Sequence, residues 1–527
     1  MVVAATGSLT GTHNLDDELR TIDAVLARSA FLTPEAPALL NTNGDRISYG
    51  RLANEAGIVR DFLMTEGVRP TDRVALVTPR GVDAVATFFG IVGCAALVPV
   101  EPDIAEGELE SLLSRLDIRF VVTPVDCPPA VAAAARRTQV KILNTSTAAP
   151  GWPLQTPSDT FDASHLTASP DIGLHSHAIL LRTSGTTSRS KIVPITHLNL
   201  LACIEKVVPW CKLTAQDRCL NLMPLYHGHG FTVGMLVPFL SGGSTIMPDA
   251  LDPQDLVAQM ESGAPTWVTG AASFYRMILS HTAKTGKTID APALRFMRTS
   301  SEATSPADVK AMETLTGVPM NTSYGSSECQ SHILAKPFES GTDCFGLVGI
   351  PVTSEISVLN ECGAVRRSGV GELLIRGDTV IDHYIGDPDA AAAAFHGNWF
   401  RTGDLARIEI DGSVSLCGRL KELISRGGEK VSPGEIEDVL ALHPDVGEAV
   451  AFPVPHETLG EEVCAAVTLI NQDSKDKQSA TRDIRRHASR HLRAYKIPKK
   501  IFVVDAMPRG RTGKLDRNQV ARALMGR

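Results

Sequence analysis

The pattern of apolar and polar positions changes about two thirds of the way along the chain. Before that point, stretches of helical periodicity alternate with short apolar runs, which is typical of layered α/β structure with buried strands. We interpret the longest uncharged stretch, residues 84–100, as a core helix that runs into a buried strand, because it barely reaches the length of a membrane span. The short apolar runs occupy residues 73–77, 120–123, 178–181 and 266–269.

From about residue 356, apolar and polar positions alternate with a period of two, as in half-buried β-strands. The alternation is clearest in residues 405–417, where two such runs flank the turn residues Asp411 and Gly412. This arrangement predicts a β-hairpin. The alanine runs at residues 132–135 and 390–394 are predicted to be turns of helix.

Helical periodicity returns at Ser432. The serine can cap the helix, a proline follows at the first helical position, and Glu435 can reach back to the serine N–H. This pattern predicts a capping box. Ile436, Val439 and Leu440 would form the apolar face of the helix.

The composition is that of an ordinary globular protein. The chain has 527 residues, which predicts two to four structural units at about 150 residues each. Lys and Arg number 51 against 59 Asp and Glu, a net charge of −8 that favours neither a nucleic-acid partner nor a membrane surface. The 10 cysteines include no C-x-x-C pair, which argues against a zinc or iron–sulfur framework. The N-terminus lacks a signal-peptide pattern, so we expect a cytoplasmic protein with reduced thiols and no membrane span.

A loop rich in small hydroxylated residues carries the first chemical signal. The apolar run that ends at Leu181 leads into RTSGTTSRSK, residues 182–191. Hydroxyls and backbone N–H groups can donate to phosphate oxygens, Gly185 permits unusual backbone angles, and Lys191 offsets negative charge. No Walker A pattern can be aligned here. Taken alone, the stretch is also typical of a solvated loop. Its interpretation as a phosphate-binding loop therefore depends on the other motifs of the chain.

Four further segments follow in order: residues 324–328 (YGSSE), 400–404 (FRTGD), 418–422 (GRLKE) and 508–514 (PRGRTGK). They supply an aromatic ring beside a carboxylate, an acid after a glycine turn, basic residues after the hairpin, and a lone lysine on a loop. Together with the phosphate loop, these motifs resemble the adenylate-forming superfamily of acyl-CoA synthetases, peptide-synthetase adenylation domains and firefly-type luciferases. The resemblance runs from about residue 30 to about residue 520.

The resemblance implies an α/β fold. Residues 1–418 would form a large N-terminal domain of layered α/β subdomains with a β-rich section, which binds ATP and the acyl group. Residues 419–421 would be a hinge, and residues 422–527 a small, mobile α+β domain. The implied enzyme is a ligase: a carboxylate attacks the α-phosphate of ATP, pyrophosphate leaves, and the acyl-adenylate passes its acyl group to a thiol.

The resemblance also implies which residues bind the nucleotide. Tyr324 would stack on adenine, Asp404 would accept from the ribose hydroxyls, and Arg419 would reach the ribose or a phosphate. Glu328 and Thr187 would hold Mg²⁺, which prefers oxygen ligands. The implied ATP- and AMP-binding residues are Thr183, Ser184, Gly185, Thr186, Thr187, Lys191, Ser301, Glu302, Ala303, Tyr324, Gly325, Ser326, Ser327, Glu328, Asp404 and Arg419.

Further residues take implied roles in catalysis and domain movement. Lys514 would place positive charge on the attacking carboxylate and the α-phosphate. Lys421 would be the residue about which the C-terminal domain swings between the two half-reactions. The segment implied to face coenzyme A contains Ser425, Arg426, Gly427, Gly428 and Lys430. A turn ahead of the Ser432 helix is the alternative interpretation of that segment.

The chain departs from the common pattern at two places. The phosphate loop continues with Ser188 and Arg189 in place of a glycine-rich ending, which reduces its backbone freedom. Glu302 puts a carboxylate where many members have a small residue, and the sequence offers no account of it. The gate motif MPLYHGHG, residues 223–230, supplies His227 as a catalytic gate residue and lacks the aspartate that binds an amino-acid ammonium. An α-amino acid substrate is therefore disfavoured.

Coenzyme A is the expected acceptor of the acyl group. Fatty acyl-AMP ligases carry an insertion ahead of the hairpin region, and residues 349–373 leave no room for one. Two alternatives remain open at this point. The acceptor could be a discrete carrier protein, or the chain could be a noncatalytic nucleotide-binding member of the fold, although Lys514, Glu328 and the loop hydroxyls are all present.

The acid is predicted to be short and polar, with a dicarboxylate as the first candidate. The phosphate-loop, gate and GRLKELISRGGEK segments look most like the oxalate–CoA ligase branch of the superfamily. Independently, Ser301 would shorten the acyl pocket, and His229 could donate to a second carboxylate. The alternative is that His229 is hydrogen-bonded within the fold while His227 alone acts as the gate. The sequence does not decide the oligomeric state.

Overall fold

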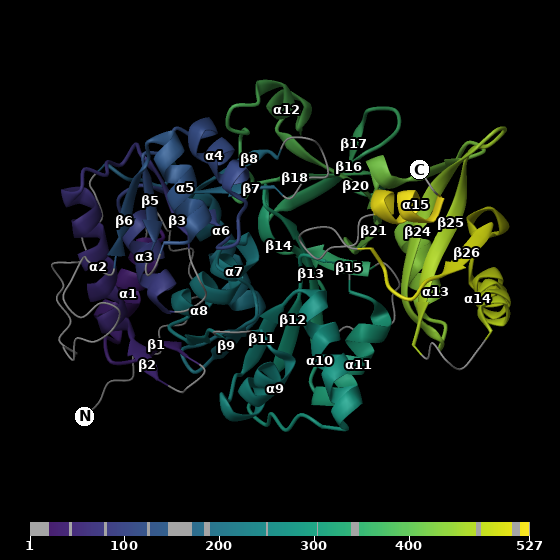
Figure 1. The fold of residues 1–527 in the computed structure, drawn as a ribbon, viewed down its shortest axis with the longest axis horizontal. Coiled ribbons are helices and arrows are strands. Elements are labelled where there is room, and N and C mark those ends of the chain that lie inside the picture. Colours follow the sequence, from purple (N-terminus) through teal and green to yellow (C-terminus); the bar gives the residue numbers. More distant parts are fainter. Residues whose placement is uncertain are drawn as a thin grey trace.

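The computed structural model describes residues 20–41, 45–77, 82–123, 127–145, 171–183, 190–248, 251–302, 304–338, 347–470, 476–508 and 517–525. Three β-sheets and the helices packed on them make up the fold (Figure 1). In Figure 1 the C-terminal sheet lies at the right, and β13, β15 and β21 lie between it and the helix-covered sheets at the left. The α/β fold class expected from the sequence is confirmed.

The first sheet follows the order β6-β5-β3-β4-β7-β8, with parallel pairing up to β7 and an antiparallel last strand. Its strands are almost entirely buried runs of valine, leucine, isoleucine and alanine, as expected for a sheet covered on both faces. The bounds are β3 Arg73–Val77, β4 Ala96–Val100, β5 Phe120–Thr123, β6 Lys141–Asn144, β7 His177–Arg182 and β8 Ile192–Thr196. The apolar runs at residues 73–77 and 120–123 are strands as predicted.

The second sheet has the most strands, and its pairing changes from parallel to antiparallel across the sheet. Strands β13, β12, β11, β9, β10 and β1 are parallel, and β2 closes that edge in antiparallel pairing. The strands of this half are β1 Pro37–Leu40, β2 Arg46–Ser48, β9 Arg218–Asn221, β10 Ser244–Ile246, β11 Trp267–Gly270, β12 Phe296–Thr299 and β13 Met320–Ser326. Ligands of α/β sheets bind beyond the carboxyl ends of such strands.

From β13 onward the same sheet is antiparallel, in the order β14-β15-β21-β20-β18-β16-β17. The predicted hairpin over residues 405–417 is confirmed, since β20 and β21 pair directly, with Ile408 opposite Val414. The strands are β14 Gln330–Ala335, β15 Leu347–Pro351, β16 Glu355–Leu359, β17 Val365–Arg366, β18 Gly369–Arg376, β19 Phe395–His396, β20 Trp399–Ile408 and β21 Val414–Arg419.

Helices cover both sheets (Figure 1). One large core includes residues of α1, α2, α3, α6 and α8, whereas α4 and α5 pack on the first sheet in a second cluster and α9, α10 and α11 pack on the second sheet in a third. The long uncharged stretch forms α3 and β4, as predicted, and both alanine runs lie in helices or at their ends. The bounds are α1 Asp23–Leu32, α2 Tyr49–Thr65, α3 Val82–Val92, α4 Glu106–Arg115, α5 Pro129–Thr138, α6 His197–Trp210, α7 Gly228–Phe231, η4 Thr232–Leu236, α8 Val237–Leu240, α9 Pro253–Ser262, α10 Ala272–Thr285, α11 Pro306–Thr316 and α12 Pro388–Ala393.

The C-terminal part has a sheet and a core of its own. Strands β23, β22, β25 and β24 are antiparallel, and β26 adds to β25 in parallel. Helices α13 and α14 pack on this sheet around Ile436 and Ile484. The bounds are η5 Leu420–Glu422, β22 Ile424–Arg426, β23 Glu429–Val431, α13 Pro433–Ala441, β24 Val446–His456, β25 Gly460–Leu469, α14 Lys477–His491, η6 Ala494–Lys496, β26 Lys500–Val503 and α15 Arg517–Met525. The division at residues 419–421 stays a prediction.

The capping box predicted at Ser432 is only half formed. The Ser432 hydroxyl accepts from the Glu435 N–H at 3.4 Å, so the serine is the N-cap as expected. The Glu435 carboxylate, however, binds the Lys496 ammonium at 2.6 Å instead of the serine N–H. A charged partner in η6 outcompetes a neutral backbone donor, because charge-assisted hydrogen bonds are stronger.

Two further expectations concern thiols and membranes. The nine cysteines among the described residues are all free. Within the described ranges, no helix combines the length and apolar character needed to cross a bilayer.

Candidate active site

Three of the predicted ATP-site residues meet at one carboxylate. Asp404 on β20 and Arg419 on β21 are register partners, and Arg419 Nε lies 3.0 Å from Asp404 Oδ1. The phenol of Tyr324, on β13, donates to Asp404 Oδ2 at 2.5 Å. Burial raises the pKa of Asp404, while Arg419 and the Tyr324 hydrogen bond oppose that rise. Burial and the adjacent carboxylate raise the pKa of Tyr324 well above its usual 10, so the phenol remains a donor at neutral pH.

A glycine turn aims Asp404. Gly403 has a φ of +73°, in the left-handed region that favours glycine. Its N–H donates to Glu372 Oε1 at 3.0 Å, and the same carboxylate pairs with Arg401 at 2.7 Å. The Asp404 N–H donates to Thr402 Oγ1 at 3.0 Å. These bonds hold the backbone from Gly403 to the Asp404 N–H and so help to set the direction of the Asp404 carboxylate.

The two ends of the predicted phosphate loop face each other. They extend the antiparallel pair β7–β8, in which Arg182 lies opposite Ile192. The Thr183 N–H donates to the Lys191 carbonyl at 3.0 Å, and the Lys191 N–H donates to Thr183 Oγ1 at 3.1 Å. The base of the loop is therefore a closed hairpin. The loop residues Ser184, Gly185, Thr186 and Thr187 lie outside the described residues.

Tyr384 joins the phosphate loop to the predicted metal-binding carboxylate. The Lys191 ammonium lies 4.4 Å from the centroid of the Tyr384 ring, and the Tyr384 phenol donates to Glu328 Oε1 at 2.9 Å. Burial and Glu328 raise the pKa of Tyr384, which keeps the phenol protonated. Sequence reasoning missed Tyr384, because a single tyrosine outside every motif carries no signal of its own.

The residues between Tyr324 and Glu328 form the tight turn that their sequence predicts. A Cβ on Gly325 would lie 2.7 Å from the backbone oxygen of Gln330, so the close approach of β13 and β14 requires glycine here. Ser326 is the last residue of β13, and Ser327 begins the turn. Glu328 lies in this turn between β13 and β14, where it accepts from the Tyr384 phenol.

The two histidines of the gate motif have different environments. His227 is exposed at the N-cap of α7, with its ring centroid 4.8 Å from that of Tyr226. His229 is buried, with Nδ1 3.1 Å from Ser301 Oγ and Nε2 2.7 Å from Thr269 Oγ1. Burial lowers the pKa of His229 well below 6.5. Both ring nitrogens of His229 are thus engaged within the fold, while His227 is exposed to solvent.

Ser301 and Glu302 follow the end of β12 and point to different neighbours. Ser301 is exposed and has a φ of +74°. The Glu302 carboxylate accepts from the Ser273 N–H at 3.1 Å and from Arg276 at 3.4 Å. Ser273 lies in the first turn of α10, where the helix dipole favours negative charge. The carboxylate that the sequence left unexplained therefore caps a helix. Ala303 lies outside the described residues.

The predicted hinge and coenzyme A segment lie in sequence after β21. Lys421 is exposed in the short 3-10 helix η5. The segment that follows forms the hairpin β22–β23, whose two-residue loop has a φ of +58° at Gly427 and +89° at Gly428. Positive φ at both loop residues is what a tight hairpin with right-handed twist requires.

The two basic side chains of this hairpin differ in their partners: Arg426 binds a carboxylate, whereas Lys430 binds a neutral hydroxyl. Arg426 binds the Glu462 carboxylate with two hydrogen bonds, at 2.5 and 3.1 Å. Lys430 is exposed and donates to Ser425 Oγ at 2.6 Å. Lys430 is therefore better placed than Arg426 to meet a phosphate.

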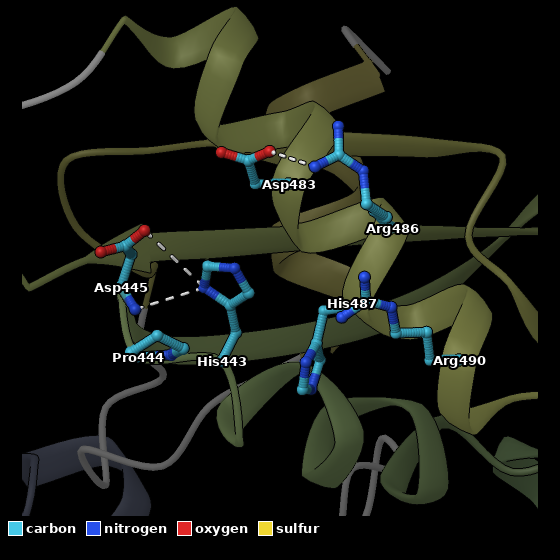
Figure 2. Close-up of a pocket in the computed structure, with 7 residues that line it drawn as sticks. All are labelled: His443, Pro444, Asp445, Asp483, Arg486, His487 and Arg490. Carbon is cyan, nitrogen blue, oxygen red and sulfur yellow. Dashed lines mark hydrogen bonds and ion pairs between the residues drawn. The ribbon is translucent and has the colours of Figure 1, made fainter.

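Lys514 lies outside the described residues, so its predicted role stays a prediction. A cavity of about 440 Å³ in the C-terminal part is separate from the site. Figure 2 shows that acidic and basic groups around it pair with one another: Asp445 faces His443, and Asp483 lies 3.3 Å from Arg486. Its lining residues are His443, Pro444, Asp445, Asp483, Arg486, His487 and Arg490.

Comparisons with known proteins show which family this chain resembles in sequence and fold. The profile of the AMP-binding enzyme family matches residues 26–385, and that of the AMP-binding enzyme C-terminal domain matches residues 435–514. An oxalate–CoA ligase of Arabidopsis thaliana is 32% identical, over 96% of this chain and 99% of the relative. A sulfoacetate–CoA ligase of Cupriavidus necator is 31% identical, over 94% and 96% of the two chains.

A crystal structure of ATP-bound MatB from Rhodopseudomonas palustris superposes with a TM-score of 0.81 at 26% identity, covering 96% of this chain and 99% of that one. The family match, the near full-length relatives and the fold agree. The chain therefore belongs to the AMP-binding enzymes, and it is an acid–CoA ligase that activates a carboxylic acid with ATP as an acyl-adenylate and transfers the acyl group to coenzyme A.

Proposed function

We propose that the enzyme forms the coenzyme A thioester of a short acid that carries a second acidic group, with oxalate as the first candidate. The observation that supports this proposal is the contact after β12, where Nδ1 of buried His229 lies 3.1 Å from Oγ of exposed Ser301, which we take as the wall of the acyl pocket. Side chains at this place shorten the acyl pocket and line it with polar groups, which disfavours a long alkyl chain. Two relatives support it by name, since oxalate and sulfoacetate both carry two acidic groups.

In the first half-reaction, the substrate carboxylate attacks the α-phosphate of ATP and pyrophosphate leaves. Tyr324 would lie against the adenine, and Asp404 would accept from the ribose hydroxyls. Both Asp404 oxygens already have one partner, but each retains a further lone pair for a ribose hydroxyl. Arg419 would then neutralise the carboxylate while it holds the sugar.

The polyphosphate would lie at the closed hairpin of Thr183 and Lys191. Mg²⁺ bound with a nucleotide needs only one or two protein carboxylates, because the phosphates and waters complete its coordination. Glu328 fits that requirement, being a carboxylate that Tyr384 orients beside Lys191. When bound, the ion would neutralise charge on the pyrophosphate leaving group.

In the second half-reaction, the thiol of coenzyme A attacks the acyl carbon and AMP leaves. We propose that Lys514 serves only the first step and that rotation about Lys421 replaces it with the β22–β23 hairpin. The exposed Lys430 supports this use of the hairpin, because coenzyme A carries several phosphates. His227, exposed at the gate, would open or close the path of the thiol.

Pyrophosphate release, measured across oxalate, acetate, benzoate, hexanoate and palmitate with and without coenzyme A, tests the proposal. We expect oxalate to support release and thioester to accumulate only with coenzyme A. Release that is greatest with hexanoate or palmitate would contradict the short-diacid assignment, and thioester formation on an added carrier protein but not on coenzyme A would contradict the acceptor.

A further inference from the structure

A buried arginine without a carboxylate partner lies behind His229, the residue that contacts Ser301. Arg298, in the middle of β12, has an exposed fraction of 0%, and its Nη2 has no hydrogen-bond partner among the described residues. Among the described residues, the ionisable groups that act on its charge are three thiols and a phenol rather than a carboxylate: Cys203, Cys211, Cys219 and Tyr275. Burial lowers the pKa of Arg298 to about 10, so the guanidinium is still charged at neutral pH. A buried, uncompensated charge is costly and calls for an explanation.

The contacts of Arg298 determine where two histidines carry their protons. Its Nε donates to His332 Nδ1 at 2.8 Å, and its Nη1 contacts His229 Nε2 at 2.7 Å. A guanidinium only donates, so each histidine must accept through the nitrogen that faces it. Burial and Arg298 lower the pKa of both histidines well below 6.5, so both are neutral. His229 therefore carries its proton on Nδ1, and His332 carries its proton on Nε2.

The tautomer of His229 determines the hydrogen-bonding role of Ser301, which lies at the surface. The His229 Nδ1–H donates to Ser301 Oγ at 3.1 Å. Because the serine oxygen accepts this bond, its own hydrogen is directed to another acceptor. Ser301 is exposed, so that acceptor lies on the open side of the wall. The chain of contacts from Arg298 through His229 thus makes Ser301 a donor toward the acyl pocket.

Two hydrogen-bond donors of this neighbourhood have no partner among the described residues. The His332 Nε2–H is buried without a partner among the described residues, like Arg298 Nη2. His332 is also held at a φ of +68°, a strained conformation for a residue other than glycine. An excess of donors and positive charge is complementary to an acceptor-only group such as a carboxylate or sulfonate.

We propose that Arg298 is a positioning residue for substrate selectivity. It fixes the tautomer of His229, so that Ser301 donates to the second acidic group of the substrate, and it supplies uncompensated positive charge behind that group. The inference rests on the proposed function, since it requires an acid with two acidic groups. The inference adds Arg298 to the residues that determine substrate selectivity. Arg298 is fully buried, so it acts through His229 and Ser301 and does not itself contact the substrate.

The test compares kcat/KM for pyrophosphate release with oxalate and with acetate. The variants are Arg298→Met, Arg298→Lys and Ser301→Ala, with Arg295→Met as the matched control. Arg295 precedes the same strand, but it is half exposed and pairs with Asp217. A site built to bind a polar group rejects the analogue that lacks it, so Arg298→Met should lower the oxalate-to-acetate ratio about 100-fold or more. Arg298→Lys, which keeps a charged donor, should restore part of the ratio.

Ser301 is exposed, so Ser301→Ala is expected to fold. This variant allows the test to be carried out even if Arg298→Met does not fold. It should lower the ratio about tenfold, whereas Arg295→Met should leave the ratio unchanged. If oxalate and acetate activities fall together in the Arg298 and Ser301 variants, Arg298 is structural and the inference is overturned while the ligase function stands. If the wild type releases pyrophosphate with no acid of the panel, the proposed function fails, and this inference fails with it.

Discussion

The Tyr324 phenol donates to the carboxylate of Asp404, a residue 80 positions further along the chain, at 2.5 Å. Arg419 binds the other oxygen of that carboxylate at 3.0 Å. The β20–β21 hairpin and the distant strand β13 are therefore joined at one buried acid. Because Arg419 directly precedes η5 with Lys421, a change of conformation at the proposed hinge would act on the proposed nucleotide site through this carboxylate.

Replacement of Asp404 by alanine is expected to raise KM for ATP by about tenfold or more, because a charged acceptor for two hydroxyls is lost. Tyr324→Phe keeps the ring and should have a smaller effect. Asp411→Ala, at the exposed tip of the same hairpin, is the control and should leave KM unchanged. Steady-state kinetics of pyrophosphate release measure all three. An unchanged KM in Asp404→Ala would remove Asp404 from the ATP site.

Lys514→Ala is expected to lower adenylate formation about 100- to 1,000-fold while largely sparing thioester formation from a supplied acyl-adenylate. The reason is that its positive charge is needed only where the α-phosphate is attacked, and such groups contribute about 3–4 kcal/mol to transition-state stabilisation. Lys499→Ala, an exposed lysine of the same part of the chain, is the control. Equal losses in both half-reactions would contradict the assignment.

Lys421→Pro should separate the two half-reactions. Proline fixes φ near −65°, which is compatible with a 3-10 helix, so the substitution should restrict rotation about this residue. We expect one half-reaction to survive and the overall turnover to fall sharply. Lys421→Ala keeps the rotation and should retain turnover. Wild-type turnover in Lys421→Pro would show that the domain movement uses another residue.

Stability should decrease as the pH falls below about 6.5, because three buried histidines have lowered pKa values. His197 is the clearest case: burial lowers its pKa to about 3, and its Nδ1 accepts from the Ile22 N–H at 3.1 Å. Between about pH 6.5 and 3, His197 binds a proton in the unfolded chain but not in the folded chain, which costs up to about 1.4 kcal/mol per pH unit.

The variant His197→Gln isolates that contribution. It should be less stable than the wild type at neutral pH. Its free energy of unfolding should also fall less steeply between about pH 6 and 4.5, with a slope that is smaller by about 1.4 kcal/mol per pH unit, the contribution of one proton. Urea unfolding at several pH values measures both curves. Parallel curves for the two proteins would mean that His197 titrates normally in the folded state.

Periodicity was enough to predict the buried strands β3 and β5 and the β20–β21 hairpin, because burial of one or both faces dictates their apolar pattern. The motifs likewise pointed to Tyr324, Asp404 and Arg419 as one site, and the fold brings them together.

Side-chain pairing was not predictable in the same way. Glu302 and Glu435 find partners in other elements, Arg276 and Lys496, and no local pattern encodes such contacts. Arg298 did carry a signal, since a charged residue inside the buried run of β12 is rare unless it is paired or functional. Its significance became visible only with His229 and His332 placed around it.

The most direct test of the central claim is the identity of the acid, measured as kcat/KM for coenzyme A thioester formation with oxalate and with hexanoate, and with the thioester product identified by mass. The account predicts that oxalate is preferred by at least about 100-fold, because in our proposal exposed Ser301 would shorten the acyl pocket and the buried charge of Arg298 would favour a second acidic group. Equal rates, or a preference for hexanoate, would contradict it.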